Sequence, residues 1–168
     1  MAENYPTSRR ALLALLLAPV PPVLLLFLFD VAERVSAFGS EAILGAALLA
    51  IYTLIVAEVL AIVFGGIALV TLWHRVRASL PVALLVGGAV ATLPIAVFIL
   101  LMSIDMGGSG TYNASYNGQP TVIDNKKTAY GLWRDFISLS YLFGLGALGG
   151  ATFWLICRPK KSAVPSDA

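Results

Sequence analysis

The sequence is poor in cysteine and histidine. Its 168 residues include one cysteine, Cys157, and one histidine, His74. A single cysteine cannot form an intrachain disulfide, and without a CxxC motif the chain cannot perform thiol–disulfide exchange between paired cysteines. The sequence also has no HExxH zinc motif, no phosphate-binding loop and no recognisable Ser-His-Asp set. We therefore predict that the protein is not an enzyme, that it has no catalytic residues, and that it binds neither a metal nor a cofactor.

Charged residues are also scarce. They make up 12% of the chain, whereas 59% of the residues are hydrophobic and the mean hydropathy is +0.88. A soluble domain has about 25% charged residues, so this chain has too little polar surface to cover a globule in water. The net charge of +2 gives no reason to expect a nucleic-acid partner. The composition predicts an integral membrane protein of one domain, surrounded by a lipid bilayer.

The hydrophobic residues fall into four long runs, at 11–29, 42–73, 80–102 and 132–157. A helix of about 20 apolar residues crosses the hydrocarbon core of a bilayer, so we predict an all-α fold with four transmembrane helices in a compact bundle. Pro19, Pro21 and Pro22 lie inside the first run. Proline removes a backbone donor and clashes with the preceding turn, which predicts a kink or break there. The run at 42–73 is too long to cross the bilayer upright, so its helix is expected to tilt or to extend beyond the membrane.

Three polar segments connect these runs. The segment 30–41 is predicted to be a short acidic loop, and 74–79 a short basic turn. The longer segment 103–129 contains Asn117-Gly118 between residues typical of strands. This dipeptide favours a two-residue turn, so the segment between the third and fourth helices is predicted to form a small β-hairpin.

The basic residues predict the orientation in the membrane. The N-terminal tail, the turn at 74–79 and the C-terminal tail contain most of them, namely Arg9, Arg10, Arg75, Arg77, Arg158, Lys160 and Lys161. Lys and Arg close to membrane spans remain in the cytoplasm. We therefore predict a multi-pass protein of the bacterial inner membrane, with both termini in the cytoplasm and the hairpin in the periplasm.

The N-terminus allows a second interpretation. Ser8-Arg9-Arg10 is similar to the start of a twin-arginine export signal, and Val35-Ser36-Ala37 is similar to a cleavage site. The apolar run between them is longer than the 7–15 residues usual in a signal core. We therefore favour an uncleaved first helix anchored by its arginines.

Small residues recur at every fourth position in three of the runs. Ala57, Ala61 and Gly65 form such a series in the second run, Gly87 lies in a similar series in the third, and Gly146 and Gly150 form a GxxxG pair in the fourth. Small residues allow the backbones of neighbouring membrane helices to approach closely. We favour packing within the chain, and a homodimer contact stays open as the alternative.

Glu58 is the candidate functional residue, because it is an acid at the centre of the second run. Counting from the cytoplasmic end of each run places Thr92, Ser140 and Tyr141 at a similar depth. No Lys or Arg lies in the middle of any run, and an unpaired carboxylate at that depth is costly. Two interpretations stay open. The group of residues could be a proton or cation site, or Glu58 could be a neutral carboxyl that is hydrogen-bonded to a hydroxyl or a backbone carbonyl and has only a structural role.

The sequence supports two hypotheses for function. The first is an accessory or interaction subunit of a larger membrane complex or envelope system, with a membrane protein as its partner. The alternative is an oligomeric proton-coupled transporter or channel that uses the carboxyl of Glu58.

Overall fold

A computed structural model describes residues 8–40, 42–72, 79–105 and 111–158. In these ranges the chain forms six α-helices, one π-helical turn and three short strands. Four helical segments are long and apolar enough to cross a membrane: Arg9–Ser36, Ile43–Thr71, Leu80–Leu101 and Ala129–Cys157. Most of the predicted basic turn, the end of the second predicted span at Trp73, and the basic tail after Arg158 lie outside the described residues.

The first span consists of two helices, α1 (Ser8–Leu17) and α2 (Val20–Phe38). The predicted break therefore occurs at the prolines. The carbonyl of Ala18 would normally accept a hydrogen bond from residue 22, but Pro22 has no N–H. This oxygen lies against Gly149 of the last helix, where an added Cβ would be 3.1 Å away from it. A small residue on the neighbouring helix thus leaves room for the break.

The prediction of an acidic loop at 30–41 is wrong, because α2 continues through this segment to Phe38. The Arg34 guanidinium donates to both carboxylate oxygens of Asp30 at 2.8 Å, a pairing across one helical turn that stabilises a helix. No strong helix breaker occurs in 30–38. The helix ends at Gly39, whose φ of 76° is a conformation that glycine adopts without strain.

The second span begins as α3 (Ala42–Leu60) and ends as α4 (Gly66–Leu72). Between them lies one π-helical turn, η1 (Ala61–Gly65). The third and fourth spans are the helices α5 (Leu80–Asp105) and α6 (Ala129–Cys157). A π-helical turn contains an extra residue per turn, so it changes the faces that α3 and α4 present to their neighbours.

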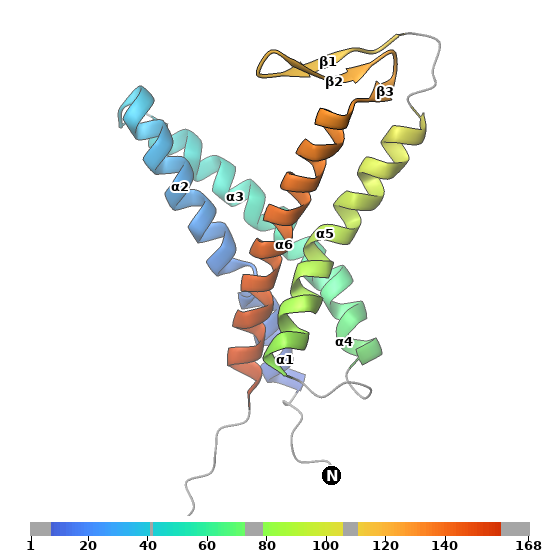
Figure 1. Cartoon of the computed structure of the whole chain (residues 1–168). Coiled ribbons are helices and arrows are strands. Elements are labelled where there is room, and N and C mark those ends of the chain that lie inside the picture. Colours follow the sequence, from blue (N-terminus) through green and yellow to red (C-terminus); the bar gives the residue numbers. More distant parts are fainter. Residues whose placement is uncertain (1–7, 41, 73–78, 106–110, 159–168) are drawn as a thin grey trace, which may run out of the picture.

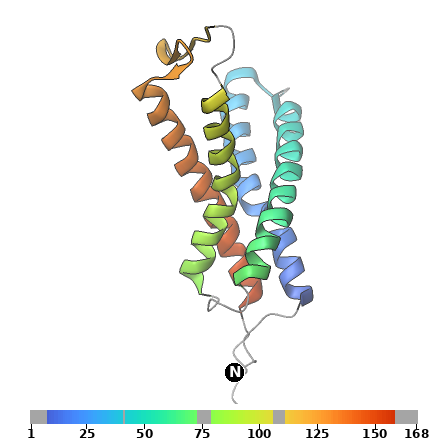
Figure 2. The same ribbon diagram turned by 90° about the vertical axis from the view of Figure 1, so that its right-hand side faces the viewer.

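Figures 1 and 2 show how the spans are arranged. At one end of the molecule α1 and α5 begin, and α4 and α6 end. Helix α6 contacts α1 and α5. The π-helical turn η1 also contacts α1 and α5. Toward the other end, the α2–α3 pair lies apart from the α5–α6 pair (Figure 1). The spans therefore pack together near one end and separate into two pairs near the end where the sheet lies.

Helices α5 and α6 form the most extensive contact between helices. Their backbones touch at three glycines. A Cβ added to Gly87 would lie 2.7 Å from Gly150 Cα, and it would also overlap the carbonyl oxygen of Gly146. A Cβ added to Gly146 would lie 2.6 Å from Ala91 Cβ. Carbon atoms in contact prefer separations of about 3.5–4.0 Å, so this crossing has no room for a side chain.

The three strands form an antiparallel sheet in the order β1 (Ala114–Tyr116), β2 (Gln119–Ile123) and β3 (Lys126–Lys127). The turn between β1 and β2 is Asn117-Gly118, with φ values of 49° and 75°, as a type I′ turn requires. In the turn between β2 and β3, Asp124 and Asn125 also have positive φ angles, of 47° and 64°. The local turn chemistry thus sets the shape of this segment.

The sheet is attached to the start of α6. The hydroxyl of Thr128 accepts a hydrogen bond from Gly131 N at 3.0 Å and so caps the helix. A Cβ at Gly131 would overlap the carbonyl oxygen of Thr121. An ion pair joins Lys127 of β3 to Asp135 of α6. These contacts hold the sheet directly above the last span.

Candidate functional site

Glu58 lies on α3, one turn before η1 begins. Before this point the second span packs on α2, and after it η1 contacts α1 and α5. Gly65, at the end of η1, lies against α1, where an added Cβ would be 2.9 Å from Leu15 Cδ1. π-Helical turns are frequent at functional sites. The acid of the second span is therefore next to a local change of helix geometry and of packing partner.

The carboxyl of Glu58 is partly covered. The side chain is half-buried, and its Oε2 atom is buried with no hydrogen-bond partner among the described residues. By insertion scales, an acidic or basic side chain at the centre of a membrane helix costs about 2.5–3.5 kcal/mol. In a bilayer the carboxyl would therefore have to be neutral, hydrated, or paired with a group outside the described residues.

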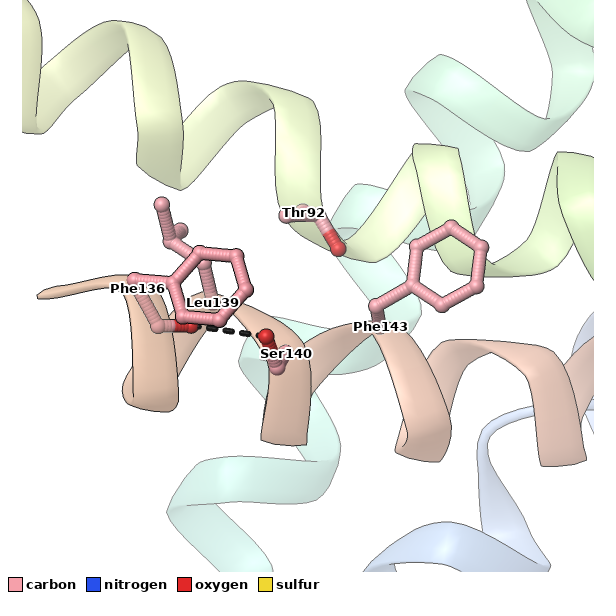
Figure 3. A pocket seen from close by; sticks show the side chains of 5 residues that line it. All are labelled: Thr92, Phe136, Leu139, Ser140 and Phe143. Carbon is pink, nitrogen blue, oxygen red and sulfur yellow. Dashed lines mark hydrogen bonds between the residues drawn. The ribbon is translucent and has the colours of Figure 1, made fainter. Parts of the chain in front are cut away.

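Thr92 and Ser140 lie together, in a shallow hollow of about 280 Å³ between α5 and α6. Its other lining residues are Phe136, Leu139 and Phe143 (Figure 3). Each of the two hydroxyls donates to the carbonyl four residues earlier on its own helix, at 2.7 Å and 2.8 Å respectively. Because both donors are already used, the hollow offers an apolar surface with no free hydroxyl proton.

The structure does not bring the four predicted site residues together. Neither Glu58 nor Tyr141 lines the hollow that Thr92 and Ser140 share, and the side chain of Tyr141 is 52% exposed. A hydroxyl hydrogen bond to Glu58 was one of the two open interpretations, and no described hydroxyl donates to Glu58 Oε2. Counting residues from the end of each run predicts depth, but it does not specify the face of the helix on which each residue lies.

The small residues singled out for packing lie at several contacts. Gly87, Gly146 and Gly150 meet at the crossing of α5 and α6. Because α5 of the same chain covers this pair of glycines, that surface is not free for a second copy. On the second span Gly65 meets α1, and the half-buried Ala57 and Ala61 lie on the less exposed side of the helix.

One feature that the sequence reasoning missed is the uncovered surface around Glu58. Leu44, Leu48, Ile51 and Ile55 precede it at spacings of four, three, four and three residues, which places all five on one face of α3. The four aliphatic side chains are between 56% and 70% exposed. We call these five residues the Glu58 face. Their spacing was readable in the sequence, but a run that is apolar on all sides does not show which side is covered.

The opposite side of α3 has a different composition. Ala46, Ala50, Thr53 and Ala57 lie there, and Ala46 is 1% exposed. Helix α3 contacts α2 extensively and α5 only slightly. The helix thus uses its small residues for packing inside the chain. Its exposed side carries the aliphatic residues of the Glu58 face and, beside them, Leu49, Tyr52, Val56 and Val59.

No described group of three His, Cys, Asp or Glu side chains is arranged to hold a metal ion. Comparison with known proteins found no matching family model, no matching curated protein and no matching solved structure. The function must therefore be argued from the geometry of Glu58 and the surface around it.

Proposed function

We propose that this protein is an accessory subunit of a larger membrane complex or envelope system in a bacterial inner membrane. Its four apolar spans would form a transmembrane bundle, and its role would be to bind another membrane protein. The absence of catalytic motifs from the sequence is compatible with such a role.

The observation that supports this proposal is the Glu58 face. Lipid covers exposed leucine and isoleucine without cost, since lipid tails are as apolar as those side chains. It does not solvate a carboxyl in the same way, and ionisable residues in membrane spans usually face protein or water. A face that combines large aliphatic residues with an acid is therefore better matched by a protein surface than by lipid alone.

Charge at the two ends of the molecule supports the proposed orientation. Arg9, Arg10 and Arg158 lie at the end where α1 begins and α6 ends. The guanidinium of Arg158 lies 5.9 Å from the ring centre of Trp154, an aromatic residue of the type found at membrane interfaces. This end would face the cytoplasm by the positive-inside rule, and the sheet would then lie in the periplasm.

Site-specific photocrosslinking in native membranes tests the proposal. A photoreactive residue at Leu48, which is 61% exposed, should crosslink reproducibly to one partner protein. The matched control is Ala46, which is 1% exposed against α2 and should give only intramolecular products. Crosslinks from Leu48 to lipid alone, or to a second copy alone, would contradict the role as an accessory subunit.

A proton-coupled transporter or channel is the second candidate, and one observation favours it. Glu58 Oε2 is buried without a hydrogen-bond partner in the described structure, next to the π-helical turn η1. A carboxyl that forms no structural hydrogen bond is available to take up and release a proton. Purified protein in vesicles containing a pH-sensitive dye should then carry protons, and Glu58→Gln should abolish this flux while the fold is retained.

A further inference from the structure

From the Glu58 face we infer that the partner is a transmembrane helix with a lysine or arginine at the depth of Glu58, and that the two side chains form an ion pair inside the membrane. This inference rests on the proposed role as an interaction subunit. It adds the chemistry by which the partner is recognised.

Charge complementarity favours a basic residue on the partner. Charged side chains within membrane spans pair with one another or with backbone carbonyls. Glu58 has no such partner within the described chain. A basic residue on a second protein would remove the cost of the unpaired carboxylate, and the pair would form only in the complex.

A second copy of this chain does not supply that base. Every lysine and arginine of this sequence lies at or beyond the ends of the four spans, apart from Arg34 and Arg134. Arg134 lies in the second turn of α6, and its guanidinium is 4.0 Å from the ring centre of Tyr116 in the sheet. Arg34 is already paired with Asp30, and it is near the end of α2. Two copies packed through their Glu58 faces would therefore bring two acids together without a base.

The shape of the surface matches a partner helix. The residues of the Glu58 face follow the alternating four- and three-residue spacing of a helix–helix seam. A single polar residue in such a seam selects the partner and its register. Glu58 would have this role among the four aliphatic side chains, which would supply the contact area.

The inference can be tested with full-length protein in phosphatidylcholine vesicles and synthetic transmembrane peptides. Three leucine-rich peptides of about 20 residues would differ only at the central position, which is Lys, Gln or Leu. Energy transfer between dyes on the protein tail and on the peptide measures association. The Lys peptide should bind about five- to thirtyfold more tightly than the Leu peptide, the range expected for an interhelical polar interaction. It should also bind more tightly than the Gln peptide, which can form a hydrogen bond but no ion pair.

Variants of this protein then assign the effect to the carboxyl. Glu58→Gln should remove the preference for the Lys peptide, and Glu58→Lys should transfer it to a peptide with a central Asp. Ile55→Ala is the matched control on the same face, and it should weaken all peptides while retaining the preference. Equal binding of the three peptides to the parent, or a preference that survives in Glu58→Gln, would overturn the inference.

Crosslinking separates this inference from the proposed function. If the crosslink from Leu48 to a partner persists unchanged in Glu58→Gln, the protein is an interaction subunit and the ion pair is wrong. If the crosslink is lost in Glu58→Gln, and the same variant fails to distinguish the peptides, both observations support the pair. If the parent crosslinks only to lipid, the proposed function itself is wrong and this inference is wrong with it.

Discussion

The crossing of α5 and α6 gives the sharpest stability prediction, which is that Gly146→Ala destabilises the protein. The added Cβ would lie 2.6 Å from Ala91 Cβ, and it would overlap the carbonyl oxygen of Gly87. Neither neighbour can rotate away, because one is a backbone atom and the other is bonded directly to the backbone. The two helices must therefore move apart at the place where they pack most closely.

Two opposing terms determine the size of the effect. Overpacking of a closely packed site costs about 1–3 kcal/mol. Replacing glycine by alanine within a helix contributes about 0.5–1 kcal/mol of stability. The net loss in the free energy of unfolding should thus be about 0–2.5 kcal/mol, measured as a shift in the denaturation midpoint in detergent.

Gly144→Ala is the matched control, because it makes the same chemical change on the same helix. Nothing lies within 4 Å of the position that its Cβ would take, so the substitution adds no overpacking. The gain in helix stability from replacing glycine by alanine remains, and the variant should be unchanged or up to about 1 kcal/mol more stable. Equal effects of the two substitutions would refute the packing argument. If Gly146→Ala retained full stability but lost self-association, the glycine pair would instead be a contact between two copies.

Three further predictions concern topology and the sheet. A reporter fused after Ala168 should report a cytoplasmic location and one inserted at Gly118 a periplasmic location, and the same location for both would exclude the four-span topology. Thr128→Ala should cost about 0.5–2 kcal/mol because it removes the cap of α6, and unchanged hydrogen exchange in the first turn of α6 would contradict this. Asp135→Asn should increase hydrogen exchange in the sheet because it breaks the ion pair with Lys127. This increase should be smaller in about 1 M salt, which screens the ion pair in the parent. An increase that does not depend on salt would indicate that the ion pair is not its cause.

The parts of the fold that depend on local chemistry were predictable from the sequence. The break at Pro19 follows from the chemistry of proline, and the β1–β2 turn follows from the preference of Asn117-Gly118 for positive φ. The prediction of a loop at 30–41 is wrong, because acidic residues do not by themselves prevent a helix. Helix propensity and the pairing of Asp30 with Arg34 outweighed that polarity.

The candidate site was less predictable, because the sequence specifies depth better than orientation around the helix axis. Thr92 and Ser140 were expected near one another, and both line one hollow. Glu58 and Tyr141 have similar predicted depths but belong to other surfaces. The orientation of each helix depends on contacts such as those of Gly65 with α1 and Gly146 with α5, which involve residues far apart in the chain. The π-helical turn after Glu58 likewise has no marker in its sequence of Ala, Ile, Val, Phe and Gly.

The sequence does not show what covers each side of the second span. Glu58 is the residue of that span through which this can be determined. In water, an exposed row such as Leu44, Leu48 and Ile51 would by itself indicate a missing partner, since exposed apolar area is unfavourable there. In a bilayer that inference fails, because lipid and a protein helix present similar apolar surfaces. The carboxyl is the one group on the Glu58 face whose free energy depends strongly on whether lipid, water or a basic side chain covers it. The identity of what covers α3 is therefore accessible through Glu58, and not through the aliphatic residues around it.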